Sequence, residues 1–160
     1  MKAFNLFIKK HNIYLLLACI ILLQTVCLTV SFANNKKGYH SDELWSYGFA
    51  CSSDGMNVFS ERDGRTPKNM DKWVDSSVLH NYITIDRSET FDYTSVYQNS
   101  ADDYHPFLYF ALLHFICSIF PGTFSMWYAY VINIIFFIIQ QIFLFKLIRS
   151  LTGNSYWGII

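Results

Sequence analysis

Charge is missing from two long parts of this 160-residue sequence. No Asp, Glu, Lys or Arg occurs in the 21 residues from Ile13 to Ala33 or in the 42 residues from Tyr104 to Phe145. Uncharged apolar runs of about 20 residues are typical of transmembrane helices. The chain is 52% hydrophobic and 19% aromatic but only 15% charged, a composition that disfavours a soluble globular domain.

Acidic residues are absent outside one part of the chain. All twelve Asp and Glu residues lie between Asp42 and Asp103. The segment 34–103 holds only seven Lys and Arg residues against these twelve acids, so its net charge is −5. A negative segment with no cluster of Lys and Arg argues against a nucleic-acid partner.

Cysteine and glycine motifs are also lacking. The four cysteines stand at positions 19, 27, 51 and 117, and none belongs to a C-x-x-C pair. The sequence therefore predicts neither a disulfide framework nor a cysteine metal site. It also contains no glycine-rich loop between a strand and a helix, so it gives no signature of nucleotide binding.

The pattern of charge predicts an all-α polytopic membrane protein. We expect about three transmembrane helices and a large extracytoplasmic loop that contains short interfacial helices. The expected segments are a cytoplasmic tail (1–12), a first transmembrane helix (13–33), the extracytoplasmic loop (34–103), a second transmembrane helix (104–120), a third (124–145) and the start of a further helix (146–160). Pro121-Gly122 would join the second and third helices.

The positive residues beside the spans predict the orientation. Lys2, Lys9 and Lys10 precede the first span, which by the positive-inside rule keeps the N-terminus in the cytoplasm and puts the loop outside. Three crossings would then place Lys146 and Arg149 outside, against the same rule. A reentrant second segment would remove this conflict.

A cleaved signal peptide is the alternative to a retained first helix. Ser31-Phe32-Ala33 resembles a small-x-small cleavage site, and cleavage there would release a secreted protein that starts at Asn34. The apolar run is longer than the roughly 7 to 15 residues of a signal-peptide core. The uncharged run after residue 103 also argues against a secreted protein, so a retained anchor is favoured.

The loop begins with a predicted helix that carries two acids. Ser41 is a suitable N-cap, and Asp42 and Glu43 would occupy the first turn. Trp45 and Phe49 follow at helical spacing, which would hold the acids beside an apolar, membrane-facing surface. A charged first turn that only complements the helix dipole is the simpler interpretation of Asp42-Glu43.

The remainder of the loop alternates turns with short helices. Residues 51–67 are rich in Gly, Ser, Asp and Arg and are expected to form turns. Apolar residues between Met70 and Tyr82 share one stripe, as in an interfacial amphipathic helix or in a helix that packs on its own loop. Another short helix is expected within 91–100.

A polar motif opens the second apolar run. Pro106 suits the first turn of a helix, because its missing amide proton would have no partner there. Asp103 and His105 would lie at the mouth of this helix, where exposed amides favour an anion such as a phosphate. Alternatively, Asp103 is only a cap, and Tyr104 and Tyr109 are interfacial aromatics.

Acids and a histidine beside a membrane helix suit an enzyme that acts on a lipid-linked phosphate. A carboxylate can take a proton from an acceptor hydroxyl, and positive groups can stabilise the departing phosphate. Asp42-Glu43 and Asp103-Tyr104-His105 are far apart in sequence, so only the fold can bring them together. Asp42, Glu43 and Asp103 could also ligate magnesium or manganese, although the sequence commits to no metal.

These residues resemble the N-terminal part of GT-C fold glycosyltransferases, in the bacterial protein-mannosyltransferase-like and lipopolysaccharide-core-transferase-like branches. In that family an Asp-Glu pair follows the first span, as in Ser41-Asp42-Glu43-Leu44-Trp45. An Asp-x-His-Pro-Pro-Leu-Tyr-Tyr motif opens the second span, as in Asp103 to Phe110. This chain departs from the motif at Phe107 and Phe110, which replace the second proline and the second tyrosine.

The resemblance implies a function and its residues. Asp42 would be the catalytic carboxylate, which deprotonates the acceptor as it attacks the anomeric carbon, and Glu43 would support it. Asp103, His105 and Tyr109 would line the same external cavity and bind the donor, a sugar linked to a polyprenyl phosphate in the membrane lipid. The acceptor would be a glycan, lipid or protein outside a bacterial plasma membrane.

Members of this family have more spans than this sequence. We therefore expect the chain to be the N-terminal part of a longer transferase and to be inactive by itself. The alternative from another functional class is a small membrane-anchored binding or assembly protein with an acidic external loop. Asp42→Asn separates the two, because a transferase should lose turnover and a binding module should lose little.

Overall fold

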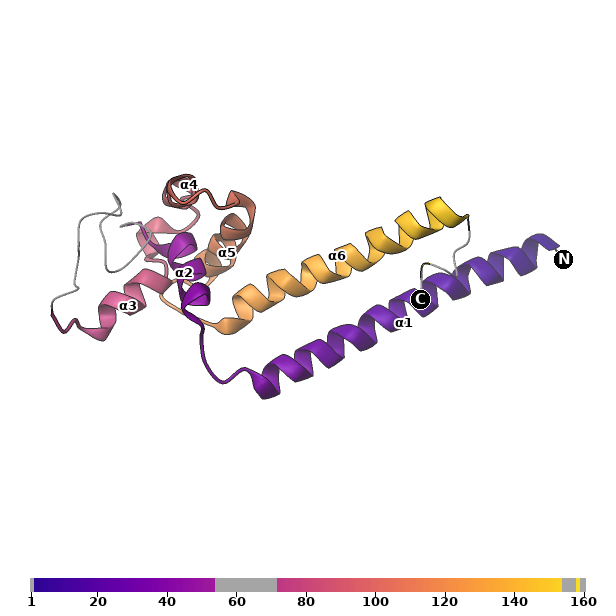
Figure 1. Cartoon of the computed structure of the whole chain (residues 1–160), viewed down its shortest axis with the longest axis horizontal. Coiled ribbons are helices and arrows are strands. Elements are labelled where there is room, and N and C mark those ends of the chain that lie inside the picture. The colour runs from indigo at the N-terminus through magenta and orange to yellow at the C-terminus, as the bar shows by residue number, and fades with distance from the viewer. Residues whose placement is uncertain (1, 54–71, 154–157, 159–160) are drawn as a thin grey trace. The chain divides into compact units, whose positions relative to one another are not determined.

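The computed structural model describes residues 2–53, 72–153 and 158 (Figure 1). The regular structure of these residues is entirely helical, so the expected all-α class is confirmed. The helices, in chain order, are α1 (Lys2–Asn35), α2 (Ser41–Cys51), α3 (Ser76–Ile83), the 3-10 helix η1 (Arg87–Glu89), α4 (Thr94–Asp102), α5 (Phe107–Ile119) and α6 (Met126–Thr152).

The chain divides into two units. The α1/α6 unit comprises residues 1–37 and 133–160, and the α2–α5 unit comprises residues 38–132. The first seven residues of α6 therefore belong to the α2–α5 unit. Each unit is described separately below.

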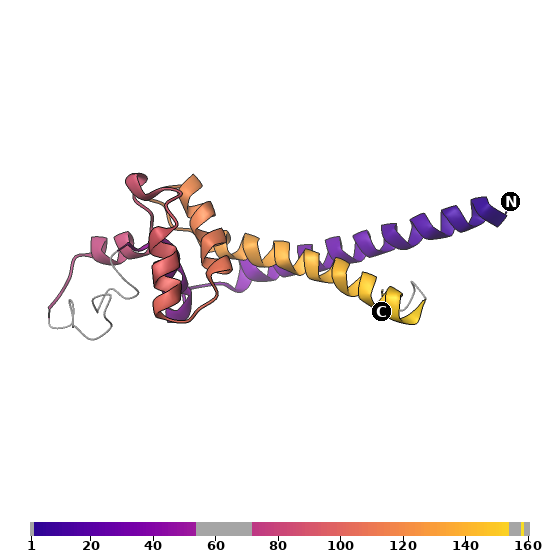
Figure 2. The same ribbon diagram turned by 90° about the horizontal axis from the view of Figure 1, so that it is seen from above.

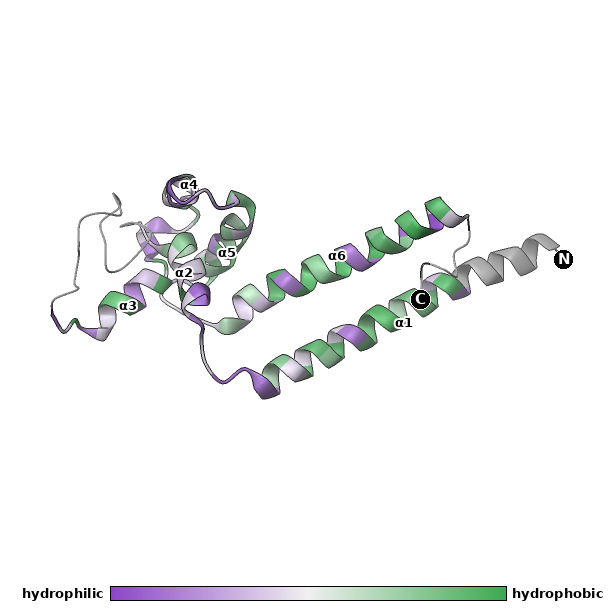
Figure 3. Cartoon of the chain, viewed as in Figure 1, coloured by the Kyte–Doolittle hydropathy of each residue, from purple (hydrophilic) through white to green (hydrophobic). Residues whose placement is uncertain are grey.

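Two helices in the described part of the chain are long and apolar enough to cross a membrane. They are Asn12–Asn35, which has 24 residues and lies within α1, and Met126–Thr152, which is α6 and has 27 residues. Hydrophobic residues follow one another along both (Figure 3). Most of their side chains are exposed, which distinguishes them from helices of a soluble core.

The second expected span, 104–120, does not form a helix of spanning length. Its helix is α5, which has 13 residues. At 1.5 Å per residue it measures about 20 Å, whereas the hydrocarbon core of a bilayer is about 30 Å thick. The expectation of three transmembrane helices is therefore not confirmed, because the uncharged run contains one short helix and one long one.

Several helix boundaries differ from those expected. The α1 helix begins at Lys2 and so includes residues 2–12 of the expected tail. The α3 helix begins only after Asp75, whose carboxylate accepts the Ser77 amide as an N-cap. Trp73 therefore precedes the helix and is fully exposed. Met70 and most of the expected turn region 51–67 lie outside the described residues.

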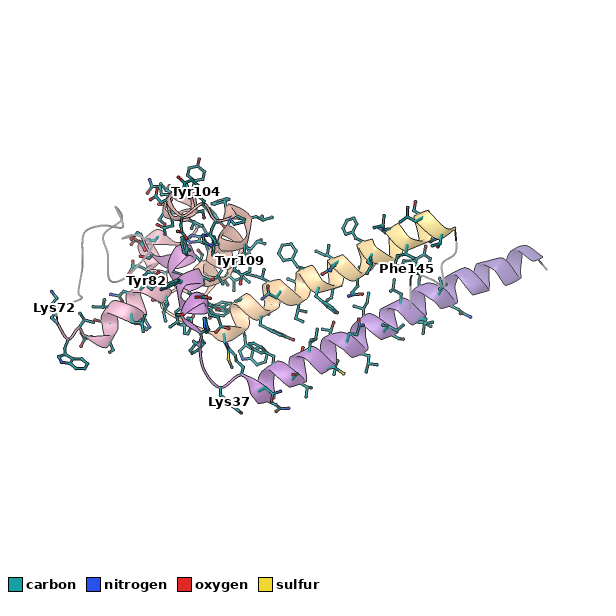
Figure 4. All side chains as sticks on the ribbon, viewed as in Figure 1. Lys37, Lys72, Tyr82, Tyr104, Tyr109 and Phe145 are labelled. Atoms are coloured by element: carbon teal, nitrogen blue, oxygen red, sulfur yellow. The ribbon has the colours of Figure 1, made fainter. Side chains whose placement is uncertain are left out.

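The α1/α6 unit is an antiparallel pair of helices. Arg149 donates a hydrogen bond to the Tyr14 hydroxyl, and the ring of Tyr14 meets that of Phe145 edge to face at 5.8 Å. Ile13 and Phe145 are both buried, and Figure 4 labels Phe145 on α6. The N-terminal part of α1 therefore lies beside the C-terminal part of α6.

The short helices of the α2–α5 unit lie close together (Figure 2). Their buried side chains form one apolar core. The C-terminal half of α2 is buried, and α5 packs against it. Phe49 of α2 stacks on Phe110 of α5 with 5.0 Å between ring centroids. Leu113 of α5 and Val96 of α4 are completely buried in the same core. Helical spacing in each segment thus produces one shared apolar surface.

The α3 helix approaches α2 at Gly48. A Cβ atom at this position would lie only 1.9 Å from Cζ of Tyr82 in α3. Tyr82 is buried, and this burial raises the pKa of its hydroxyl. Glycine is required here because the tyrosine ring occupies the space of a side chain.

Long-range hydrogen bonds hold the loops of this unit to α5 and α6. After α5, Gly122 adopts a positive φ of 69° and donates its amide to the Ile85 carbonyl at 2.9 Å. The Phe91 amide donates to Ser118 Oγ of α5 at 3.0 Å. The Tyr47 hydroxyl donates to the Ser125 carbonyl at 2.6 Å, immediately before α6. Both ends of the 120–125 connection are therefore fixed to the unit.

Candidate functional site

The Asp-Glu pair lies in the first turn of α2, as expected, but the capping residue is His40 and not Ser41. His40 has an extended backbone, and its Nδ1 accepts the Asp42 amide at 3.3 Å. In the opposite direction, the Glu43 carboxylate accepts a hydrogen bond from the His40 amide at 3.2 Å. Together these bonds form a capping box. The Glu43 carboxylate therefore has a structural role at the start of the helix.

Asp42 has no such role. Its side chain is 74% exposed and contacts only Ser41 Oγ and His40 Nδ1, both at 3.4 Å, among the residues that the structure describes. Asp75, Asp86 and Asp92 differ, because each accepts a nearby backbone amide, and these hydrogen bonds lower the pKa of each carboxyl. Three acids of the loop thus stabilise local turns, whereas Asp42 is available to a ligand.

His40 was not singled out in the sequence, although it directly precedes Ser41-Asp42. Its Nδ1 lies 3.3 Å from the Asp42 amide and 3.4 Å from Asp42 Oδ2. An unprotonated Nδ1 can accept the amide, whereas a protonated Nδ1 can donate to the carboxylate, so the two interactions exclude each other.

Asp103 and His105 form the second part of the site. His105 Nδ1 lies 2.6 Å from Asp103 Oδ2 and 3.0 Å from the Asp103 carbonyl oxygen. This geometry fixes the imidazole and commits Nδ1 to donation, which leaves Nε2 for another partner. The His105 side chain is about half exposed. Asp103 therefore acts as the residue that orients His105.

The residue between them is strained. Tyr104 follows α4 with a positive φ of 56°, and the His105 amide donates to the Ser100 carbonyl at 3.0 Å, as in a Schellman motif. Glycine normally occupies this position, and a side chain there costs about 1 to 2 kcal/mol. The Tyr104 ring is 96% exposed, so packing does not compensate for the strain (Figure 4). A strained, exposed aromatic is a candidate for ligand or membrane contact.

The packing of α2 on α5 brings the two polar segments together. The His105 ring lies 5.4 Å from that of Phe49 in α2. Tyr109 is partly buried, and burial together with the nearby charge of Glu43 raises the pKa of its hydroxyl. Asp42 lies seven residues before Phe49, about 10 Å along the helix axis. Asp42 and His105 therefore share one unit without touching.

The other end of α2 is held by two polar side chains that the sequence analysis missed. Asn99 Nδ2 donates to the carbonyls of Phe49 at 3.2 Å and of Ser52 at 2.9 Å. His114 Nδ1 donates to the Ala50 carbonyl at 2.7 Å. Both side chains are completely buried, and burial lowers the pKa of His114. Their partners are 47 to 64 residues away, so no local pattern indicates them.

Neither the cysteines nor the acids form a metal centre in the described part of the chain. No group of three or more His, Cys, Asp or Glu side chains there is placed to hold a metal ion. Cys51 and Cys117 are buried in the core, and their mutual hydrogen bond and burial raise the pKa of the Cys51 thiol. These thiols are unreactive core groups.

The chain matches no protein-family model, and no curated protein or solved structure is significantly similar to it.

Proposed function

We propose that this chain forms part of an integral-membrane glycosyltransferase that takes a sugar from a polyprenyl-phosphate-linked donor. The observation that carries this proposal is the packing of α2 on α5. It places Glu43 near Tyr109 and His105 beside Phe49, so two motifs about 60 residues apart meet in one unit. The acceptor lies on the extracytoplasmic side of a bacterial plasma membrane, where the segment 34–103 is exposed.

The site residues have distinct roles in this proposal. Asp42 is the general base, because its carboxylate is exposed and serves no cap. His105 in its imidazolium form donates from Nε2 to the phosphate of the donor, and Asp103 is a positioning residue that accepts from Nδ1 and holds the ring. Glu43 fixes the first turn of α2 and sets the electrostatic surroundings of Tyr109, which lines the donor site.

The separation of Asp42 and His105 fits a ligand with two chemically different ends. Asp42 lies about two helical turns, roughly 10 Å along the axis of α2, before Phe49, and the His105 ring lies beside Phe49. A sugar joined to a phosphate can contact the imidazole with its phosphate and present its anomeric carbon nearer to the carboxylate. Direct contact between Asp42 and His105 would instead favour a simple ion pair.

The acidic residues of the loop give little support to the alternative function, a membrane-anchored assembly protein. Asp75, Asp86 and Asp92 accept backbone amides at the starts of α3, η1 and α4. Their charges therefore have a local structural explanation and do not require a basic partner.

Binding of a polyprenyl phosphate to the full chain tests the donor site. The probe is undecaprenyl phosphate, titrated into the detergent-solubilised protein and followed by native mass spectrometry. His105→Ala removes the phosphate contact and should weaken binding about ten- to a hundredfold, the value of one hydrogen bond to a charged group. His80→Ala, at an exposed histidine of α3, is the matched control. Equal affinities of the two variants would contradict the proposal.

A further inference from the structure

The α5 helix is apolar on two opposite faces. Phe110, Leu113 and Cys117 are buried against the core of the α2–α5 unit. Leu108 and Ile119 lie on the other face and are 62% and 49% exposed. Phe115 lies between them at helical spacing and is 47% exposed. A helix that only completes a soluble core would be polar on this second face.

Phe91 extends this exposed face. Its ring lies 5.9 Å from that of Phe115, and its side chain is 51% exposed. Its backbone has a positive φ of 61°. We call Phe91, Leu108, Phe115 and Ile119 the α5 apolar patch. Contiguous exposed apolar side chains of this kind mark a site of interaction.

Charged residues flank both ends of α5 and come from the same loop. Asp102 and Asp103 lie before its first turn, and both are exposed. After its last turn, Gly122 is hydrogen-bonded to Ile85, which directly precedes the exposed Asp86 and Arg87. The polar segment 86–103 therefore starts beside the C-terminal end of α5 and ends beside its N-terminal end. If α5 crossed a membrane, this segment would have to cross it as well. The cost of placing its charges in hydrocarbon excludes this arrangement.

The α1/α6 unit gives independent evidence on the number of crossings. Three crossings would make α1 and α6 run parallel, with Tyr14 and Arg149 at opposite faces of the bilayer. These residues are instead hydrogen-bonded, and Tyr14 also contacts Phe145. Two antiparallel spans bring residues 14 and 149 to the same face, as the contact requires.

We propose that α5 lies along the extracytoplasmic membrane surface with the α5 apolar patch in contact with lipid, and that α1 and α6 are the only helices of the described residues that cross the membrane. Lipid is the occupant of the patch because residues 120–125 join α5 directly to α6, a candidate span. The Tyr47 bond to Ser125 holds the start of that span against the same unit. The inference does not depend on the proposed transferase activity.

This topology removes the conflict over positive charge. With two crossings, Lys146 and Arg149 lie on the same side as Lys2, Lys9 and Lys10. All five basic residues that flank the two spans at this end are then cytoplasmic, as the positive-inside rule requires.

Labelling of single introduced cysteines in intact cells tests the number of crossings. Asn81→Cys, Thr123→Cys and Ser150→Cys introduce exposed thiols in α3, after α5 and near the end of α6. A membrane-impermeant maleimide is added to cells that express the full chain, and the unsubstituted protein gives the background. Detergent-solubilised samples, in which all three thiols must react, control for accessibility.

The expected pattern is labelling at positions 81 and 123 and protection at position 150. Three crossings predict labelling at 81 and 150 with protection at 123. Either that pattern or any other departure from the expected one overturns the proposal.

A second measurement tests the contact of the patch with lipid. Nitroxide spin labels on Ile119→Cys and Asn81→Cys are compared in proteoliposomes by their accessibility to oxygen and to a water-soluble nickel complex. The label at 119 should favour oxygen, because oxygen concentrates in hydrocarbon, and the label at 81 should favour nickel. Equal, water-like accessibilities at the two positions would overturn the lipid contact.

Discussion

The two ends of α2 are stabilised in opposite ways. At the N-terminal end, His40 and Glu43 satisfy the first amides with side chains from the same turn, and Asp42 is left exposed. At the C-terminal end, Asn99 and His114 reach the last carbonyls from α4 and α5, and both are buried. A helix end that is capped by its own turn can present an exposed carboxylate without loss of stability. An end that is capped by side chains from other helices instead stabilises the packing of those helices.

Leu113→Ala should have the largest effect, because it acts on the buried end. Leu113 is completely buried in the core shared by α2 and α5. Its truncation should lower the free energy of unfolding by about 2 to 5 kcal/mol. Thermal unfolding of the purified protein, followed by circular dichroism, measures this. A loss below about 1 kcal/mol would mean that the core contributes little to stability.

Asn99→Leu tests the hydrogen bonds at the same end. The substitution removes the hydrogen bonds that Asn99 donates to the carbonyls of Phe49 and Ser52, which should cost about 1 to 3 kcal/mol. Asn81→Leu, at an exposed position of α3, is the matched control and should change stability by less than about 0.5 kcal/mol. Similar losses in both variants would contradict the role of Asn99 as a remote cap.

The pH dependence of stability tests the C-terminal end of α2, because His114 donates a hydrogen bond there. Burial lowers the pKa of folded His114 below its ordinary value of 6.5, so the unfolded chain binds the proton first as the pH falls. Its contribution to stability is therefore complete above about pH 6.5 and is lost below it, by at most about 1.4 kcal/mol per pH unit. The measurement is unfolding between pH 8 and pH 5. His114→Gln should remove this slope, and an unchanged slope would contradict the assignment.

Tyr104→Gly should stabilise the protein by about 1 kcal/mol, because glycine adopts a positive φ without strain. Tyr104→Ala removes the same ring but keeps the Cβ atom, so it should bring little of this gain. Unfolding of the two variants under identical conditions measures the difference. Equal stabilities would show that the backbone at residue 104 is relaxed.

Part of this fold could be predicted from charge and spacing. The uncharged runs locate the two helices of spanning length, and the acids at 42 and 43 mark the start of α2. The same rule fails for 104–120, because an apolar helix packed on a protein core has the composition of a span. His114 and Ser118 on its buried face are the only local sign, and their partners at Ala50 and Phe91 are visible only in the structure.

The sequence also allowed part of the candidate site to be proposed. Asp42, Asp103 and His105 could be selected because acids and a histidine are rare beside apolar runs, and the structure adds that Asp103 orients His105. The roles of His40 and Asn99 could not be predicted. The first depends on which residue adopts an extended backbone before α2, and the second depends on a contact across 50 residues.

The most direct test of the central claim is sugar transfer with Asp42→Asn introduced into the gene at its own locus. Membranes are supplied with radiolabelled sugar nucleotides, from which the cell's enzymes load the polyprenyl-phosphate pool, and label in extracytoplasmic product is counted. Asp42 is exposed and caps nothing, so the variant should keep its stability and membrane level. Loss of a general base should reduce transfer by about a hundredfold or more. Undiminished transfer at an equal protein level would contradict the account.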